Sequence, residues 1–317
     1  MITIQFTKMH GAGNDFVVLD LTTAPSDAAE RNWGALAEQA CDRHFGIGAD
    51  GILLMLPSSQ ADVRMRIFNL DGSEAQMCGN GIRCIARYYH DRYANDRSDI
   101  VVETLAGLNP VRVLPSGDVT VDMGTPILRP ADIPVAVPGE LAFDLPLDLP
   151  DRSFTINCVS MGNPHAVTFV EAGVLGELPL GVIGPKVEHH SLFPERVNFE
   201  VCEILGPDAM RIRVWERGAG LTLACGSGAC ASVVVAQRQG RTRGPVRVDL
   251  PGGQLTIEWD GVGSVFMSGP AEYVFSGSYS ASIHPHANPL PEGEGAGPGA
   301  LSKDEGASAQ PSLAGAR

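Results

Sequence analysis

The chain has 317 residues, 44% of them hydrophobic and 19% charged, which is enough for a substantial core in one large domain or two ordinary ones. Its formal net charge of −14 argues against a nucleic-acid-binding surface, because phosphate contacts need clustered lysine and arginine. The sequence contains neither an apolar run of about 18 residues nor the basic start and apolar run of a signal peptide. We therefore predict a cytoplasmic protein with no nucleic-acid or membrane partner.

Short strand-like segments dominate the chain before residue 284, and helical patterns are fewer. Because strands outnumber helices and do not alternate with them regularly, the pattern favours an α+β fold over a doubly wound α/β sheet. In chain order, we predict strands over 2–9 and 15–20, a helix over about 26–43, a strand over 62–70, a helix over 79–93, strands over 99–105, 118–124, 165–170 and 210–218, a helix over 226–238, and a strand over 253–259.

The composition changes near residue 284. From there to the end, glycine, proline, alanine and serine replace almost all large apolar residues. Such a segment cannot bury enough apolar surface to offset the entropy cost of ordering itself. We therefore predict a disordered tail over 284–317 and assign it no catalytic role.

The rest of the sequence contains an internal repeat. "RIFNLDGSEAQMCGNG" (66–81) aligns without gaps on "RVWERGAGLTLACGSG" (213–228), which places Cys78 on Cys225. Four landmarks in the same order are improbable by chance, so we infer two similar halves with a cysteine at the same place in each. The other three landmark pairs are 9–18 with 159–170, 104–107 with 249–252, and 121–126 with 265–270.

Each of these two cysteines precedes a glycine and a predicted helix. A thiol at a helix N-terminus faces unpaired backbone N–H groups and the positive end of the helix dipole, and both lower its pKa. The same N–H groups form a site for an anion such as a carboxylate, and glycine lets the backbone approach it closely. In this sequence those N–H groups belong to Gly79, Asn80, Gly226 and Ser227.

Two such units related by a pseudo-two-fold axis would place two thiols across one cleft. Inverting a carbon stereocentre through its proton requires a base on one face and an acid on the other. A thiolate and a thiol supply both, and helix-terminal N–H groups stabilise the charge that develops on the substrate. The repeat therefore favours a racemase or epimerase that needs no cofactor and no metal.

Other uses of cysteine are less consistent with the pattern. The seven cysteines have irregular spacings that fit neither a disulfide framework nor a zinc site, and a Cys-x-x-Cys motif is absent. A thiol-dependent redox or metal-binding protein remains the alternative from another class. We assign the remaining thiols to packing, with Cys84 and Cys230 the closest in sequence to the repeat motifs; the others are Cys41, Cys158 and Cys202.

Six motifs outside and around the two cysteines carry further information. They are "KMHGAGNDFVVLD" (8–20), "RHFGIGADG" (43–51), "FNLDGSEAQMCGNGIRC" (68–84), "GNPHAV" (162–167), "FPERVN" (193–198) and "WERGAGLTLACGSGACAS" (215–232). Together they resemble the diaminopimelate epimerase family over about residues 1–280. Related two-cysteine enzymes, the proline racemases and hydroxyproline epimerases, tend to carry histidine where this sequence has Asn80, and they are the alternative within enzymes.

The resemblance implies a pyridoxal-independent enzyme that interconverts LL- and meso-diaminopimelate, in lysine and peptidoglycan-precursor biosynthesis. Cys78 and Cys225 match the acid/base pair, and His165 and Glu216 match residues that tune thiol protonation. Gly79, Asn80, Gly226 and Ser227 match the backbone cradle of the reacting carboxylate. The residues that match the grip on the substrate's amino and carboxylate groups are Asn14, Asn69, Asn163, Asn198, Glu216 and Arg217.

The resemblance also implies the architecture. We expect two pseudo-symmetric α+β lobes, each a curved, mostly antiparallel β-sheet or barrel wrapped around a central helix, with the active site between them. One lobe would comprise residues 1–124 and a returning strand at about 268–283, and the other residues 125–267. The expected partner is the small-molecule substrate diaminopimelate, with a homodimer as a possible assembly.

The sequence departs from the family pattern at two positions. Gly51 stands where glutamine is common, so a side-chain contact to the substrate is not expected there. Leu221 stands where glutamate is frequent, at a position to which no role is assigned. Neither change removes a group that the proposed chemistry needs.

Overall fold

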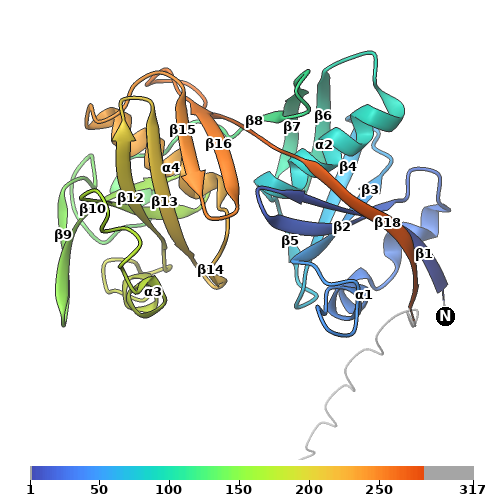
Figure 1. Ribbon diagram of the computed structural model, residues 1–317, viewed down its shortest axis with the longest axis horizontal. Coiled ribbons are helices and arrows are strands. Elements are labelled where there is room, and N and C mark those ends of the chain that lie inside the picture. Colours follow the sequence, from blue (N-terminus) through green and yellow to red (C-terminus); the bar gives the residue numbers. More distant parts are fainter. Residues whose placement is uncertain (1, 282–317) are drawn as a thin grey trace, which may run out of the picture. The chain divides into compact units, whose positions relative to one another are not determined.

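The computed structural model describes residues 2–281, which belong to one compact unit. They form an 18-stranded sheet with four α-helices and two short 3-10 helices (Figure 1). No helix in this part of the chain is long and apolar enough to span a membrane. The tail predicted over 284–317 lies outside the described residues.

The elements of the first half are β1 (Ile2–Gly11), β2 (Asn14–Asp20), η1 (Ser26–Glu30), α1 (Trp33–Ala40), β3 (Gly51–Leu56), β4 (Val63–Asn69), β5 (Glu74–Ala75), α2 (Gly79–Tyr93), β6 (Asp99–Thr104), β7 (Gly107–Val113) and β8 (Val119–Asp122). The elements that follow are η2 (Pro130–Asp132), β9 (Leu145–Leu149), β10 (Arg152–Ser160), β11 (Pro164–Val170), α3 (Leu180–Glu188), β12 (Asn198–Gly206), β13 (Ala209–Glu216), β14 (Gly220–Leu221), α4 (Gly226–Arg238), β15 (Val246–Leu250), β16 (Gly253–Glu258), β17 (Phe266–Gly269) and β18 (Glu272–Ala281).

The strand pairing of the first half is repeated in the second. In the first half, β2 is parallel to β3 and β4 is parallel to β6, while β3–β4, β4–β5, β6–β7 and β7–β8 are antiparallel. In the second half, β11–β12 and β13–β15 are the parallel pairs, and the antiparallel pairs follow in the same order. The duplicated sequence therefore folds into a duplicated topology, and the predicted α+β class with two pseudo-symmetric curved sheets is confirmed.

Two strand pairs join the halves. β17 pairs with β8, with Met267 opposite Val121, and β18 then runs back to pair with β1, with Ser280 opposite Thr3. Figure 1 shows β18 passing from the second half to the edge of the first. The lobe boundaries near residues 124 and 267 remain a prediction.

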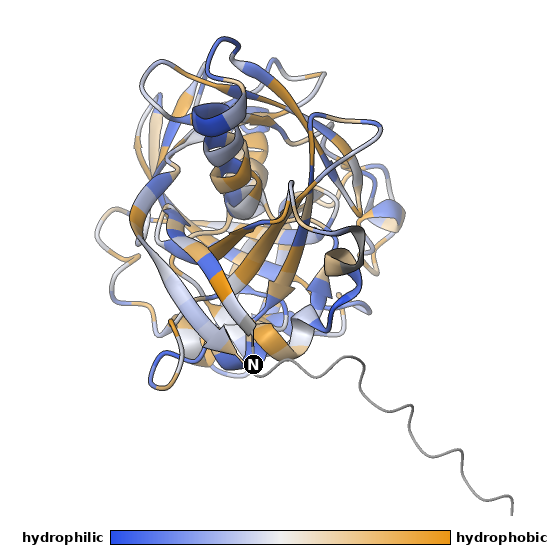
Figure 2. Cartoon of the chain, turned by 90° about the vertical axis from the view of Figure 1, so that its right-hand side faces the viewer, coloured by the Kyte–Doolittle hydropathy of each residue, from blue (hydrophilic) through white to orange (hydrophobic). Residues whose placement is uncertain are grey.

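Each half encloses one helix. α2 packs against β1, β7 and β8, and α4 packs against β10, β11, β12 and β16. Figure 2 views the first half end-on, with a helix enclosed by strands that carry apolar segments. The sequence of α4 is apolar around most of its circumference, as in Val233, Val234 and Val235, because strands surround it.

The helices outside the sheet were harder to predict. The segment predicted as one helix over 26–43 forms η1 and α1 instead, because Arg31 is extended and the Asn32 side chain caps α1 by accepting a hydrogen bond from the Ala35 N–H at 3.1 Å. α3 was not predicted. Pro185 lies within this helix, and prolines are usually a signal against a helix.

Candidate active site

Cys78 and Cys225 are the N-cap residues of α2 and α4. Both have an extended backbone, with φ −143° and ψ 117° for Cys78 and φ −124° and ψ 109° for Cys225. Each helix begins at the residue predicted from the Cys-Gly motif, Gly79 or Gly226. The thiols therefore lie where helix N–H groups and the positive end of the dipole favour a negative charge.

The starts of α2 and α4 approach each other around Met267. A Cβ atom on Gly79 would lie 3.1 Å from Met267 Cε, and one on Gly226 would lie 2.8 Å from Met267 Sδ. In addition, Asn80 Nδ2 donates a hydrogen bond of 3.4 Å to the carbonyl of Ala224, which precedes Cys225. The two halves thus bring both helix N-termini to one place, and a side chain at either glycine would require Met267 to shift.

Asn14 lies beside Cys78. The Cys78 thiol donates to Asn14 Oδ1 over 3.8 Å, and Asn80 Nδ2 donates to the same oxygen over 3.2 Å. The Asn14 amide nitrogen donates to Asp50 Oδ2 over 2.7 Å, so the amide oxygen is held toward the cysteine. Asn14 and Asn80 are therefore brought together with Cys78.

A network of charges holds the β1–β2 hairpin that carries Asn14. Asp15 forms ion pairs of 2.7 Å with Lys8 and with Arg43, and Arg43 also contacts Asp50 at 2.7 Å. Burial opposes ionisation of Asp15, but the hydrogen bonds from Arg43 and Lys8 outweigh it and lower its pKa to about 2. The hairpin is thus fixed by ion pairs that persist at neutral pH.

His165 is fully buried in the second half, between two polar partners. Its Nδ1 lies 2.7 Å from Glu200 Oε1, and its Nε2 lies 2.9 Å from Asn163 Oδ1. A Cβ atom on Gly228 would lie 2.8 Å from Glu200 Oε1 and 3.3 Å from Cys225 Sγ, so the carboxylate and the thiol converge on the same turn of α4. The His165–Glu200 pair therefore lies next to Cys225.

Two carboxyl groups act on Cys225, the fully buried Glu200 and the half-buried Glu216. Burial raises the pKa of Glu216, and hydrogen bonds from Thr222 and Cys225 oppose the rise. The Thr222 hydroxyl donates to Glu216 Oε1 over 2.5 Å. Burial likewise raises the pKa of Glu200, against the influence of His165. A proton-accepting group that is buried in this way is typical of sites that transfer protons.

The two thiols have different electrostatic surroundings. Burial raises the pKa of Cys225 well above its usual value, and the charges of Glu216 and Glu200 raise it further, while hydrogen bonds from Ser227 and the Gly228 N–H lower it. Burial also raises the pKa of Cys78, and so does Glu216, but the N–H groups of Gly81 and Asn80 and the charge of Arg83 lower it. The charge of Glu216 thus raises the pKa of both thiols, and its carboxyl group is hydrogen-bonded to the Cys225 thiol.

Other predicted site residues are held by contacts to neighbouring loops. Asn198 Nδ2 donates to the carbonyl of Pro164 over 2.8 Å, and Asn198 Oδ1 accepts from the Arg217 N–H over 2.8 Å. The Arg217 guanidinium donates to the carbonyl of Glu195 over 3.1 Å, and Asn69 donates to Ser73 Oγ over 3.0 Å. The contacts of Asn198 position the chain around Arg217.

Ser227 Oγ lies 3.6 Å from Cys225 Sγ, so the hydroxyl of Ser227 as well as its N–H is beside the thiol. All seven cysteines are free thiols. Among residues 2–281, no group of three or more His, Cys, Asp or Glu side chains is arranged to hold a metal ion.

Sequence reasoning missed several residues of this site. Glu200 had a signal, a carboxylate between the apolar residues Phe199 and Val201 of a strand-like segment, and β12 is indeed buried at that position. Arg83 and Met267 had no local signal, because their contacts join segments that are far apart in the sequence. Asp50 and Thr222 also escaped notice, because each acts through a neighbour that had been identified.

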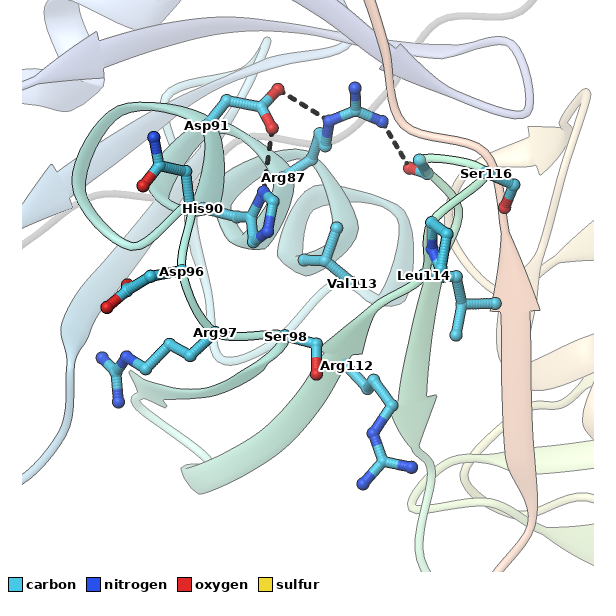
Figure 3. A pocket seen from close by; sticks show the side chains of 13 residues that line it. Arg87, His90, Asp91, Asp96, Arg97, Ser98, Arg112, Val113, Leu114 and Ser116 are labelled. Carbon is cyan, nitrogen blue, oxygen red and sulfur yellow. Dashed lines mark hydrogen bonds and ion pairs between the residues drawn. The ribbon is translucent and has the colours of Figure 1, made fainter.

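A hollow of about 490 Å³ lies away from the cysteines, beside the C-terminal end of α2 (Figure 3). Its charged groups bind one another: Arg87 Nε contacts Asp91 at 2.7 Å, Arg87 Nη1 donates to the carbonyl of Gly117 over 2.8 Å, and His90 Nδ1 lies 2.9 Å from Asp91. This hollow contains none of the predicted site residues, and its side chains stabilise the end of the helix.

The fold is shared with solved structures of low sequence identity. A PhzF-family phenazine biosynthesis protein from Bacillus anthracis matches with a TM-score of 0.65 and 17% identity, over 89% of this chain and 100% of that one. A probable proline racemase from Agrobacterium radiobacter matches with a TM-score of 0.60 and 17% identity, over 90% of this chain and 94% of that one. These similarities define the class of fold, which includes racemases.

Sequence comparisons identify the family. The model of the family described as diaminopimelate epimerase matches residues 6–128 and 157–274. A diaminopimelate epimerase of Carboxydothermus hydrogenoformans is 51% identical over 276 residues, 87% of this chain and 99% of that protein. A diaminopimelate epimerase of Desulfitobacterium hafniense is 48% identical over 279 residues, which is 86% of this chain and 97% of that protein. The chain therefore belongs to the diaminopimelate epimerase family, whose members are isomerases.

Proposed function

We propose that the protein is a cofactor-independent epimerase that interconverts LL-2,6-diaminopimelate and meso-diaminopimelate. The observation that carries the proposal is the pair of cysteines, each at the N-terminus of a buried helix, on helices that meet around Met267. Membership of the family supports the choice of substrate. Its place would be lysine and peptidoglycan-precursor biosynthesis.

The reaction proceeds by two proton transfers on opposite faces of one carbon. The thiolate of one cysteine removes the α-proton, and the electron pair of the broken C–H bond is delocalised into the carboxylate. The thiol of the other cysteine then protonates the carbon from the opposite face, so the two sulfurs have exchanged protonation states. Cys78 and Cys225 are these groups, and the reverse reaction uses them in the opposite roles.

The carboxylate beside the reacting carbon binds at the helix N-termini. Backbone N–H groups there are preorganised donors for the negative charge that develops in the transition state. They belong to Gly79 and Asn80 in the first half and to Gly226 and Ser227 in the second. Helices of 15 and 13 residues stand behind them, so both dipoles favour the same charge.

The remaining predicted residues bind the other polar groups of the substrate. Glu216 accepts hydrogen bonds from the ammonium group, and Arg217 binds the distal carboxylate. His165 positions Asn163 and tunes the proton affinity around Cys225. A site built to pair both ends of diaminopimelate rejects simple amino acids, because they would leave its polar groups unpaired. The amide side chains that complete this grip are Asn14, Asn69, Asn163 and Asn198.

Exchange with solvent deuterium tests the function. After incubation with LL-diaminopimelate in D2O, we expect deuterium at the α-carbon and formation of the meso isomer, measured by NMR and mass spectrometry. L-proline and trans-4-hydroxyproline serve as controls and should remain protonated. Exchange with proline instead would favour the related two-cysteine racemases, and absence of exchange with any of the three would contradict the proposal.

We further propose that the enzyme acts in the cytoplasm, where thiols stay reduced, and without nucleic-acid or membrane partners. Free cysteines and a formal net charge of −14 support this proposal. Two lobes, residues 1–124 with the strand at about 268–283 and residues 125–267, would close on the substrate and exclude water from the carbanion.

A homodimer is the assembly that we propose. β18 pairs only with β1 among the described strands, so its other edge is unpaired, and it exposes Tyr273, Val274 and Phe275 in succession. We expect a dimer by sedimentation velocity and a monomer for Val274→Asp, because a charge on an apolar interface is costly to bury. Val262→Asp is the control, since Val262 is 82% exposed in a loop and should not affect assembly. A monomeric unsubstituted protein would contradict the proposal.

A further inference from the structure

Arg83 is a fully buried arginine on α2. No carboxylate in the described part of the chain lies within ion-pair distance of its guanidinium, which is uncommon because burying an unpaired charge is costly. Burial lowers the pKa of Arg83, whereas negative charge on Cys84, Cys78 and Cys230 would raise it. The groups whose negative charge would most strongly offset the positive charge of Arg83 are thus cysteine thiolates.

The contacts of Arg83 fix the guanidinium beside the start of α2. Its Nη1 donates to the carbonyl of Gly79 over 3.2 Å and lies 3.8 Å from Met267 Sδ, and its Nε donates to the carbonyl of Pro270 over 3.2 Å. Its Nη2 is buried without a hydrogen-bond partner among the described residues. The side chain therefore links the first residue of the helix to the segment between β17 and β18.

The guanidinium is also confined on the side of Asn14. A Cβ atom on Gly11 would lie 2.9 Å from Arg83 Nη2, and Gly11 is opposite Asn14 in the β1–β2 pair. Asn14 Oδ1 is in turn 3.8 Å from Cys78 Sγ. The charge cannot move toward solvent without displacing this hairpin, so it stays near the Cys78 thiol.

The duplicated topology shows that this charge belongs to one half only. The position equivalent to Arg83 in α4 is Cys230, 147 residues later. Conversely, the strand positions that hold His165 and Glu200 in the second half hold Phe16 and Leu53 in the first, since β2–β3 and β11–β12 share the same register. The second half therefore has no counterpart of the Arg83 charge at the equivalent position, and the first half has no counterpart of the Glu200 carboxylate.

The charged groups around each thiol act in different directions. Glu216 on β13 disfavours the thiolate form of Cys78, and Arg83 on its own helix opposes this effect in part, together with the N–H groups of Gly81 and Asn80. Around Cys225, Glu216 and Glu200 on β12 both disfavour the thiolate. The remaining carboxylate that acts on Arg83 is Asp118, in the turn before β8, beyond ion-pair distance.

We propose that Arg83 is a positioning residue that makes Cys78 the thiolate, and leaves Cys225 the thiol, in the protein before substrate binds. The inference rests on the proposed two-thiol function. In the direction that begins with Cys78 as base, each turnover places the substrate's proton on Cys78 and leaves the negative charge on Cys225. Before the next turnover Cys78 has to release its proton to solvent and Cys225 has to take one up from solvent, and the buried guanidinium favours this exchange.

Alkylation of each cysteine as a function of pH tests the proposal without any substrate. The reduced full-length protein is treated briefly with iodoacetamide between pH 5 and 11, and modification of Cys78 and Cys225 is quantified by peptide mass spectrometry. Because only the thiolate reacts, the midpoint of each rate profile reports ionisation, whereas burial affects the limiting rate. We expect the midpoint of Cys78 to lie below that of Cys225.

Substitution of the arginine should then remove the difference. In Arg83→Met the midpoint of Cys78 should rise by about one to three pH units, the usual effect of one nearby charge, and in Arg83→Lys most of the original order should remain. Arg87→Met is the matched control. It removes a cation from the same helix, but Arg87 is paired with Asp91 and bound to Gly117 (Figure 3), so the Cys78 profile should not move.

Three results would overturn the proposal. These are a midpoint of Cys225 at or below that of Cys78 in the unsubstituted protein, an unchanged Cys78 midpoint in folded Arg83→Met, and an equal shift in Arg87→Met. If Arg83→Met does not fold, as judged by circular dichroism, the order of the Cys78 and Cys225 midpoints in the unsubstituted protein and in Arg83→Lys still tests the proposal. The alkylation experiment needs no substrate. Failure of the deuterium exchange assay would therefore reject the proposed function without changing the measured ionisation of Cys78 and Cys225.

Discussion

Replacement of either Cys78 or Cys225 by alanine is expected to lower kcat for epimerisation about 10⁴-fold in both directions, the upper end of what one proton-transferring group contributes. The reason is that each thiol serves as base in one direction and as acid in the other. The measurement is the rate of interconversion from LL- and from meso-diaminopimelate. Both variants should remain folded, because alanine keeps most of the volume at these helix starts.

Cys158→Ala is the matched control for these variants. Cys158 is buried on β10, and the backbone N–H of this residue donates to the carbonyl of Ala142, away from both helix N-termini. Its loss should leave kcat within about twofold. Near-normal turnover in both directions for Cys78→Ala or Cys225→Ala would exclude the two-base assignment.

Replacement of Glu216 by glutamine is the second substitution with a large expected effect. The change keeps the shape of the side chain and the contact with Thr222, but it removes the half-buried negative charge that raises the pKa of both thiols. Removal of one partner of a buried ionic contact costs about 2–5 kcal/mol, so kcat/KM should fall about 10²–10³-fold. Steady-state kinetics with LL-diaminopimelate measures this loss.

The pH dependence of alkylation gives a second measurement on the same variant. Because Glu216 raises the pKa of Cys225, Glu216→Gln should move the Cys225 midpoint to lower pH. Glu203→Gln is the control, since Glu203 is a mostly buried carboxylate of β12 that is bound to the Gly173 N–H and lies 3.7 Å from Arg211. Equal losses in both variants would indicate a general effect on the strands and would contradict the role given to Glu216.

The sequence predicted the two helix starts well, for a physical reason. A glycine after an extended cysteine permits the close approach of two helix termini, and the same motif recurs after 147 residues with apolar helical patterns behind it. α2 and α4 accordingly span the predicted residues 79–93 and 226–238. The repeat was informative because in each copy the helix that follows the cysteine packs against the strands of its own half.

The differences between the copies could not be predicted in this way. Whether Glu200 reaches His165 depends on the parallel register of β12 with β11, and the position of Arg83 depends on the path of the chain near Pro270. Those relations arise from contacts between segments far apart in the sequence, which local patterns do not encode. The electrostatic inequality of the two thiols therefore emerged only from the three-dimensional arrangement.

The return of β18 to β1 also constrains how the protein is made. Ile2 and Ala281 are paired, so β1, the first strand of this fold, has to wait for a partner, β18, that is synthesised last among the described strands. The first half, with α2 and its cysteine, cannot complete its sheet during synthesis, although all of its other strands are present by Asp122. Such long-range pairing slows folding, because the chain entropy is lost before the contacts form. The sheet of the first half thus depends on strands that are synthesised after the second half. The strands around Cys78 are therefore complete only when translation of the fold is finished.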